Sequence, residues 1–183
     1  MKTSIIYIVV LFSIFAISVS THAQVTTVNI YGAGFFPGGY LQDVATEGYG
    51  GGLGIGMFLN PNFLMKATAS YHNFGSKAGI HGAYAPLEIG TNVYLGYPGG
   101  IRPYLALHGG WYVASGDFRD SNYGFGGGVG LEIPLGGMGT SLQIEPGYTI
   151  VDRDDDRNHE YWTINIGIAF TLRPPSPIPI VER

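Results

Sequence analysis

Large apolar side chains alternate with small or polar ones along residues 162–172, WTINIGIAFTL. One register holds Trp162, three isoleucines, Phe170 and Leu172, and the other holds threonine, asparagine, glycine and alanine. A period of two predicts a β-strand, because a helix would scatter these side chains around its axis. A soluble sheet would bury the apolar register, whereas a membrane barrel would turn it to lipid.

Seven earlier segments repeat this pattern, so the chain is predicted to form eight strands. Each segment is about ten residues long, which is the length that a tilted strand needs to cross the hydrocarbon layer. The expected strands cover residues 26–36, 48–58, 63–74, 84–95, 103–113, 123–134, 140–151 and 161–172.

The connections between these segments are expected to alternate in length. Residues 59–62, 96–102 and 135–139 are rich in Gly, Pro and Asn and are predicted to form short turns. The segments around 37–47, 75–83, 114–122 and 152–160 are expected to be longer loops that carry most of the charge. Short turns on one side and long loops on the other are typical of an outer-membrane barrel with both termini in the periplasm.

Glycine strips on the opposite register indicate which face is inside. Four alternate glycines lie at 50–56 and four more at 124–130. In a soluble β-sandwich these glycine strips would face water and pack against nothing. Inside a narrow barrel they leave room for large inward side chains. The expected inward neighbours are Tyr31, Phe35, Lys66 and His72 beside the first strip, and Tyr104, His108 and Tyr112 beside the second. An eight-stranded barrel has just enough interior for side chains, so no open pore is expected.

The charges within the strands favour the same assignment. Lys66, Glu88, Glu132 and Glu145 all fall on the register opposite the apolar one, where they avoid the cost of about 2–4 kcal/mol that a lysine pays at mid-membrane. With His72 and His108 they are predicted to form an interior polar network. Lys66 is taken as the only cation within the strands, and Glu88 on the adjacent strand as its nearest partner.

Aromatic residues on the apolar register are expected to form the belts that flank the hydrocarbon layer. They are Tyr49, Phe63, Tyr71, Trp111, Trp162 and Phe170.

Composition and the N-terminus predict a protein that is exported to the cell envelope. Charged residues make up 12% of the 183 residues, about half the usual share in soluble proteins. Residues 1–23 read as a secretory signal peptide, with Lys2, an apolar core and Ala23 before the cleavage point. The chain has no cysteine, which excludes disulfides and a lipid-anchored cysteine. A net charge of −4 without a basic run argues against nucleic acid as a partner.

The chain resembles the small outer-membrane barrels of the OmpA and OmpX kind over residues 24–172. The resemblance rests on the eight segments, on VNIYGAGFFPGG, RPYLALHGGW and FGGGVGLEIPLG, and on a last strand that ends at Phe170. It implies insertion by the barrel-assembly machinery, which would recognise Phe170, and contact with outer-membrane lipids and lipopolysaccharide. Residues 173–183 depart from the family pattern as a Pro-rich, extended periplasmic tail. Pro146, inside the seventh expected strand, predicts a bulge or local break.

Catalytic and metal-binding alternatives are weaker. Ser70, His72 and Glu88 have the residue types of a hydrolytic triad, but outer-membrane lipid A deacylases carry theirs on the lipid-facing surface in the order His-x-Ser. In DRDDDRNHE, residues 152–160, alternate Asp and Asn residues resemble the start of a calcium loop, but Arg157 replaces the central Gly and Thr163 the bidentate Glu. A solvated acidic loop is the favoured interpretation, with divalent-ion bridging to lipopolysaccharide phosphates as the alternative. His81, His108 and His159 lack a second ligand at a convincing spacing, so neither metal nor cofactor is assigned.

The predicted function is a non-enzymatic outer-membrane barrel with a filled interior. It would act as a membrane-structural or surface-interaction protein through four extracellular loops. The alternative is transport of small apolar molecules through a lateral gap near Pro146, and a lipid hydrolase ranks third.

Overall fold

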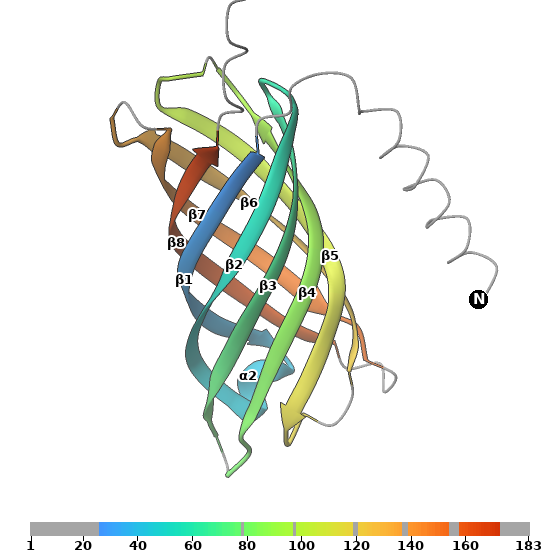
Figure 1. Cartoon of the computed structure of the whole chain (residues 1–183). Helices are drawn as coiled ribbons and strands as arrows, with labels where there is room; N and C mark the ends of the chain where they lie inside the picture. The colour runs from blue at the N-terminus through green and yellow to red at the C-terminus, as the bar shows by residue number, and fades with distance from the viewer. Residues whose placement is uncertain are drawn as a thin grey trace, which may run out of the picture.

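The computed structural model describes residues 26–77, 79–96, 98–118, 121–136, 139–153 and 158–172. Eight strands form a closed barrel in which each strand pairs antiparallel with its neighbours in chain order, and β8 pairs with β1 (Figure 1). The predicted up-and-down barrel is therefore confirmed. Its strands are β1 (Thr26–Gly39), β2 (Ala45–Asn60), β3 (Phe63–Ser76), β4 (Gly82–Tyr94), β5 (Arg102–Gly116), β6 (Asn122–Pro134), β7 (Thr140–Val151) and β8 (His159–Leu172).

The alternating registers face the two sides that the sequence predicts. Apolar side chains point outward along every strand, for example Leu53, Leu107 and Ile166, which are 53–63% exposed. Large side chains of the other register, such as Phe35, are fully buried inside the barrel. An exterior of exposed aliphatic and aromatic groups is stable only where it contacts hydrocarbon, so the barrel is a transmembrane one.

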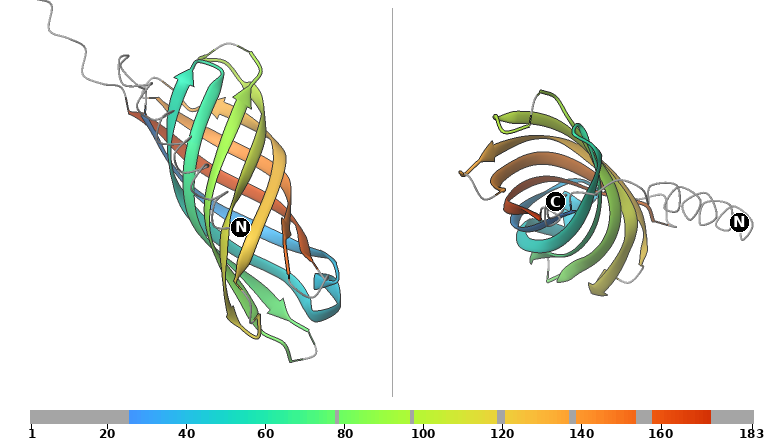
Figure 2. Two further views of the ribbon diagram at one scale, coloured as in Figure 1. Left: turned by 90° about the vertical axis from the view of Figure 1, so that its right-hand side faces the viewer. Right: turned by 45° about the horizontal axis from the view of Figure 1, so that its top comes forward.

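The strands are inclined to the barrel axis (Figure 2), and the two ends of the barrel differ. Thr26 and Leu172 are register partners at the end that carries the connections 61–62, 95–101 and 135–139, here called the turn end. The other end, the loop end, carries the connections 40–44, 77–81, 117–121 and 152–158. The short helix α2 (Leu41–Val44) lies at the loop end (Figure 1).

The prediction of long loops is wrong. Connections at the loop end are no longer than 95–101 at the turn end. Many of the residues expected in loops instead extend the strands, for example Gly38 and Gly39 of β1, which pair with Glu160 and His159 of β8. Backbone pairing continues past the apolar band because it satisfies the N–H and C=O groups of these residues whatever their side chains. The surface at this end therefore includes strand ends as well as the connections.

The glycine strip of β6 accommodates large inward side chains of β5, as predicted. A Cβ atom at Gly124 would lie 2.6 Å from the Tyr112 ring, and one at Gly126 would lie 2.4 Å from His108 Nε2. At Gly130 it would lie 2.1 Å from Tyr104 Cζ. These distances exclude any side chain unless its neighbour moves, so the glycines are required by packing and not by backbone conformation.

Pro146 interrupts the sheet without a bulge. Pairing between β6 and β7 stops after Gly128↔Gly147 and resumes in the same register at Leu131↔Ile144. Pairing of β7 with β8 continues through Pro146↔Ile164. The missing N–H of the proline therefore faces β6, and the predicted local break is confined to that side.

Among the described residues, no helix is long and apolar enough to cross a membrane. The predicted signal peptide at 1–23 and the Pro-rich tail at 173–183 lie outside the described residues.

Candidate functional site

Aromatic side chains close the barrel interior at the loop end. They come from β1, β3, β4, β5 and β8 and from the β5–β6 connection, and the fully buried Leu41 of α2 packs with them. Tyr84 Oη lies 2.7 Å from His159 Nδ1, and the Phe74 and Tyr161 rings meet edge to face at 5.2 Å. We call this group the loop-end plug; its buried members are Phe35, Leu41, Ala45, Phe74, Tyr84, Tyr112, Phe118, Val151 and Tyr161. Edge-to-face packing of this kind adds about 0.5–1.5 kcal/mol per pair beyond area burial.

A second group, the turn-end plug, closes the opposite end. Its buried apolar members are Leu64, Tyr94, Tyr104 and Ala106, with Phe58 packed against them. The guanidinium of Arg102 lies 4.2 Å from the centre of the Tyr94 ring and 2.5 Å from Glu132 Oε1. It also donates to the carbonyl of Pro61. Arg102 is only 6% exposed, so this ion pair and cation–π contact are shielded from bulk water.

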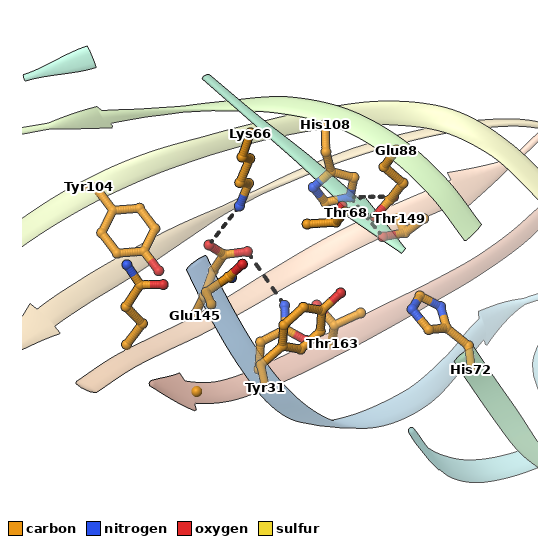
Figure 3. A pocket seen from close by; sticks show the side chains of 14 residues that line it. Tyr31, Lys66, Thr68, His72, Glu88, Tyr104, His108, Glu145, Thr149 and Thr163 are labelled. Carbon is orange, nitrogen blue, oxygen red and sulfur yellow. Dashed lines mark hydrogen bonds and ion pairs between the residues drawn. The ribbon is translucent and has the colours of Figure 1, made fainter. Parts of the chain in front are cut away.

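Between the two plugs lies a polar chamber of about 50 Å³ (Figure 3). Lys66 reaches across it to Glu145, with 3.7 Å between Nζ and Oε2. Glu88 accepts a hydrogen bond from Tyr112 and lies 3.7 Å from His108 Nε2. At roughly 10–15 Å³ per water molecule, the chamber has room for only a few waters.

The structure places the six residues of the predicted polar network inside the barrel but divides them between two groups. Lys66, Glu88, Glu145, His72 and His108 line the chamber, whereas Glu132 belongs to the turn-end plug. The pairing of Lys66 with Glu88 is wrong, because Lys66 is the register partner of Gly90 and its amino group crosses to Glu145. Lys66 is also not the only cation within the strands, because Arg102, the first residue of β5, turns inward.

Ser70, His72 and Glu88 do not assemble into a triad. Ser70 Oγ lies 3.0 Å from His72 Nε2, but the other ring nitrogen of His72 is bonded to Tyr161. Glu88 bonds instead to Tyr112. A hydrolytic histidine needs the carboxylate on its second nitrogen, and here a tyrosine hydroxyl occupies that place.

No cluster of three or more metal-ligating side chains occurs in the part of the chain that the structure describes. His108 bonds to Thr149, and His159 is bonded to Tyr84. The resemblance to a calcium loop falls partly outside the described residues, because Asp154 and Asp156 are not among them.

All six residues of the expected aromatic belt lie on the outward register. Tyr49, Tyr71, Trp111, Trp162 and Phe170 are between 39% and 73% exposed, and Phe63 is half-buried. Tyr123 and Tyr148 extend this set, since they pack against Trp111 and Trp162 with ring centres 4.6 and 4.8 Å apart. Both follow from the same period-two register. Phe170, the expected assembly signal, lies near the turn end of β8 as the partner of Val28.

No protein-family model matches the sequence, and no curated protein is significantly similar to it. Solved structures do resemble it in fold. Neisserial surface protein A has a TM-score of 0.69 at 12% identity, covering 80% of this chain and 97% of its own. OprG of Pseudomonas aeruginosa has a TM-score of 0.55 at 11% identity, covering 83% of this chain and 97% of its own. The attachment invasion locus protein Ail of Yersinia pestis, solved with the heparin analogue sucrose octasulfate, has a TM-score of 0.51 at 14% identity, covering 82% of this chain and 100% of its own. The chain therefore has the fold of the small eight-stranded outer-membrane β-barrels.

Proposed function

We propose that this protein is a non-enzymatic outer-membrane barrel with a sealed interior, which acts as a membrane-structural or surface-interaction protein. The observation that carries the proposal is the pair of plugs. Tyr84, Tyr112 and Tyr161 at one end are fully buried, and Tyr94 and Tyr104 at the other end are 1–2% exposed. The chamber between them is too small and too crowded for a continuous water column.

The proposed placement puts the turn end in the periplasm and the loop end at the cell surface. Lipids and lipopolysaccharide would surround the outward aromatic and aliphatic side chains, and the barrel-assembly machinery would recognise the last strand at Phe170. Support comes from the first and last strands, since Thr26 at the start of β1 and Leu172 at the end of β8 both lie at the turn end. This is the arrangement usual in bacterial barrels with an even strand number.

Surface interaction at the loop end would favour a partner that is not a polyanion. Exposed carboxylates at this end include Asp43, Glu47, Asp117 and Asp152. Lys77 is exposed there too, and its amino group donates to the carbonyl of Gln42. A sulfated sugar of the kind bound by Ail would therefore meet mainly like charge, which suppresses association.

The sealed interior predicts very low conductance. Purified protein inserted into planar bilayers should give no stable channels, because both mouths are closed by buried aromatic side chains. The double variant Tyr94→Ala, Tyr104→Ala removes most of the turn-end plug and serves as the comparison. Large, reproducible channels from the parent protein would exclude the sealed-barrel proposal.

The proposed orientation predicts which cysteines are labelled on intact cells. Because the chain has no native cysteine, single substitutions give unambiguous signals. Gln42→Cys and Asn158→Cys, both at exposed loop-end positions, should react with an impermeant maleimide. Pro61→Cys at the turn end should react only after the outer membrane is permeabilised. Labelling of Pro61→Cys alone on intact cells would reverse the orientation.

Transport of small apolar molecules is the second candidate, and the break at Pro146 is the observation that favours it. Two register positions between β6 and β7 lack pairing, and an apolar groove lies on the outer wall of the barrel at this break. Uptake of a radiolabelled apolar solute that is lost when Val129 is replaced by Phe would support this function over the first.

A further inference from the structure

The outer wall of the barrel carries an apolar groove of about 540 Å³. It lies across β4 to β8, on the face of the sheet that contacts the membrane. Its lining contains no charged side chain. The hydroxyl of Tyr148 donates a hydrogen bond of 2.5 Å to the carboxylate of Glu160. The lining residues are Val93, Leu105, Ala106, Leu107, Gly127, Gly128, Val129, Pro146, Gly147, Tyr148 and Trp162.

The floor of the groove is the backbone at Gly127. This residue is the register partner of Leu107 on β5 and of Tyr148 on β7, and Tyr148 is in turn the partner of Trp162 on β8. A row of four outward positions therefore crosses four strands, with large side chains on both sides of a position that has none. The Tyr148 and Trp162 rings, 4.8 Å apart, form one wall, and Leu107 forms the other.

The break in pairing between β6 and β7 deepens the groove at the same position. Pro146 lies opposite Val129 and lacks the N–H that would face β6, so the two strands are not joined there. Pro146 is also a compact side chain on the outward register. Glycine at 127 and proline at 146 thus leave a hollow where the neighbouring outward positions carry larger aliphatic or aromatic residues.

We propose that this groove is a binding site for one acyl chain of a bilayer lipid. A groove in the hydrocarbon layer has neighbours on three sides, so a chain lying in it gains dispersion contacts that the convex wall elsewhere does not offer. The surrounding bilayer supplies acyl chains at very high concentration, and a flexible chain fits an oblique, uneven groove. A second copy is a poorer fit, because association within lipid has no hydrophobic driving force and needs close, matched packing. The inference rests on the transmembrane placement but not on the sealed interior, so channel activity would leave it intact.

The two tryptophans of the chain allow a matched test. Trp162 lines the groove, whereas Trp111 lies outside it, and each packs against one tyrosine. Trp111→Phe and Trp162→Phe give single-tryptophan proteins that differ only in this respect. Both are reconstituted in phosphatidylcholine vesicles with increasing fractions of phosphatidylcholine brominated in mid-chain, and fluorescence quenching is recorded. A competing unlabelled chain is varied in length and saturation.

The quenching of Trp162 should depend on the length and saturation of the competing chain. The preference among the chains compared should be about tenfold, equivalent to about 1.4 kcal/mol. Trp111 should follow the bulk brominated fraction alone. Val129→Phe and Gly127→Val, which fill the groove from its rim and its floor, should each make Trp162 behave like Trp111. Ala67→Leu, at an exposed outward position on β3, should change nothing.

Indistinguishable curves for the two tryptophans would overturn the proposal. So would a Trp162 preference that survives Val129→Phe in a folded barrel, because the selective contact would then lie elsewhere. If Trp162 is shielded from brominated lipid and the protein cross-links as a dimer, a second copy occupies the groove and the acyl-chain site is refuted.

Discussion

Arg102→Met should lower the free energy of unfolding of the barrel by about 3–5 kcal/mol, the usual cost of removing one partner from a buried ion pair. Arg102 is the sole cation contacting Glu132 among the described residues, and both side chains are at most 11% exposed. Methionine keeps much of the side-chain volume but removes the cation from the Glu132 carboxylate, which still accepts a hydrogen bond from the amide of Gln143. The loss is measured by urea or guanidinium unfolding in detergent or lipid, followed by tryptophan fluorescence.

Two further variants separate charge from packing. Adding Glu132→Gln to Arg102→Met removes the stranded carboxylate and should restore part of the loss, which a double-mutant cycle quantifies. Lys66→Met should cost less, since its contact with Glu145 is 3.7 Å long and faces the chamber, where water can replace it. Equal losses of unfolding free energy for Arg102→Met and Lys66→Met would show that the turn-end ion pair stabilises the barrel no more than the contact of Lys66 with Glu145.

Gly130→Val should cost about 3 kcal/mol, at the upper end of the range for overpacked interiors. Its Cβ would lie 2.1 Å from Tyr104 Cζ and 2.4 Å from Cε2. Tyr104 is 2% exposed, so its ring cannot swing out into bulk solvent to make room. The expected result is a lower unfolding midpoint and a smaller folded fraction, seen as loss of the heat-modified mobility shift on electrophoresis.

Relief of the clash is the critical control for Gly130. The double variant Gly130→Val, Tyr104→Ala should be more stable than Gly130→Val alone, because the added methyl groups enter the space that the ring vacates. Gly109→Val is the outward match, since its Cβ would lie no closer than 3.4 Å to any other atom. If Gly109→Val is as damaging as Gly130→Val, strand propensity and not ring packing explains the loss.

The sequence by itself determined the strands and their two faces. A residue on one register points to lipid and its neighbour points inward, so the period of two is visible without knowledge of any partner strand. It also predicted that glycine strips receive large inward side chains, because a narrow interior requires bulk and space to be matched between adjacent strands. Accordingly, the side chains of Tyr104, His108 and Tyr112 lie against Gly130, Gly126 and Gly124.

Contacts across the interior were decided only by the closed barrel. Lys66 and Glu88 lie on adjacent strands, yet strand register sets Lys66 opposite Gly90, and barrel curvature brings its amino group to Glu145 on β7. Arg102 falls on the inward register of Tyr104 and His108, but the predicted strand begins one residue later, at 103. Leu41 in the β1–β2 connection carries no periodic signal, because its inward direction depends on how the chain turns at the barrel end. The extent of pairing at the loop end was likewise hidden, since backbone hydrogen bonds continue where side chains no longer alternate.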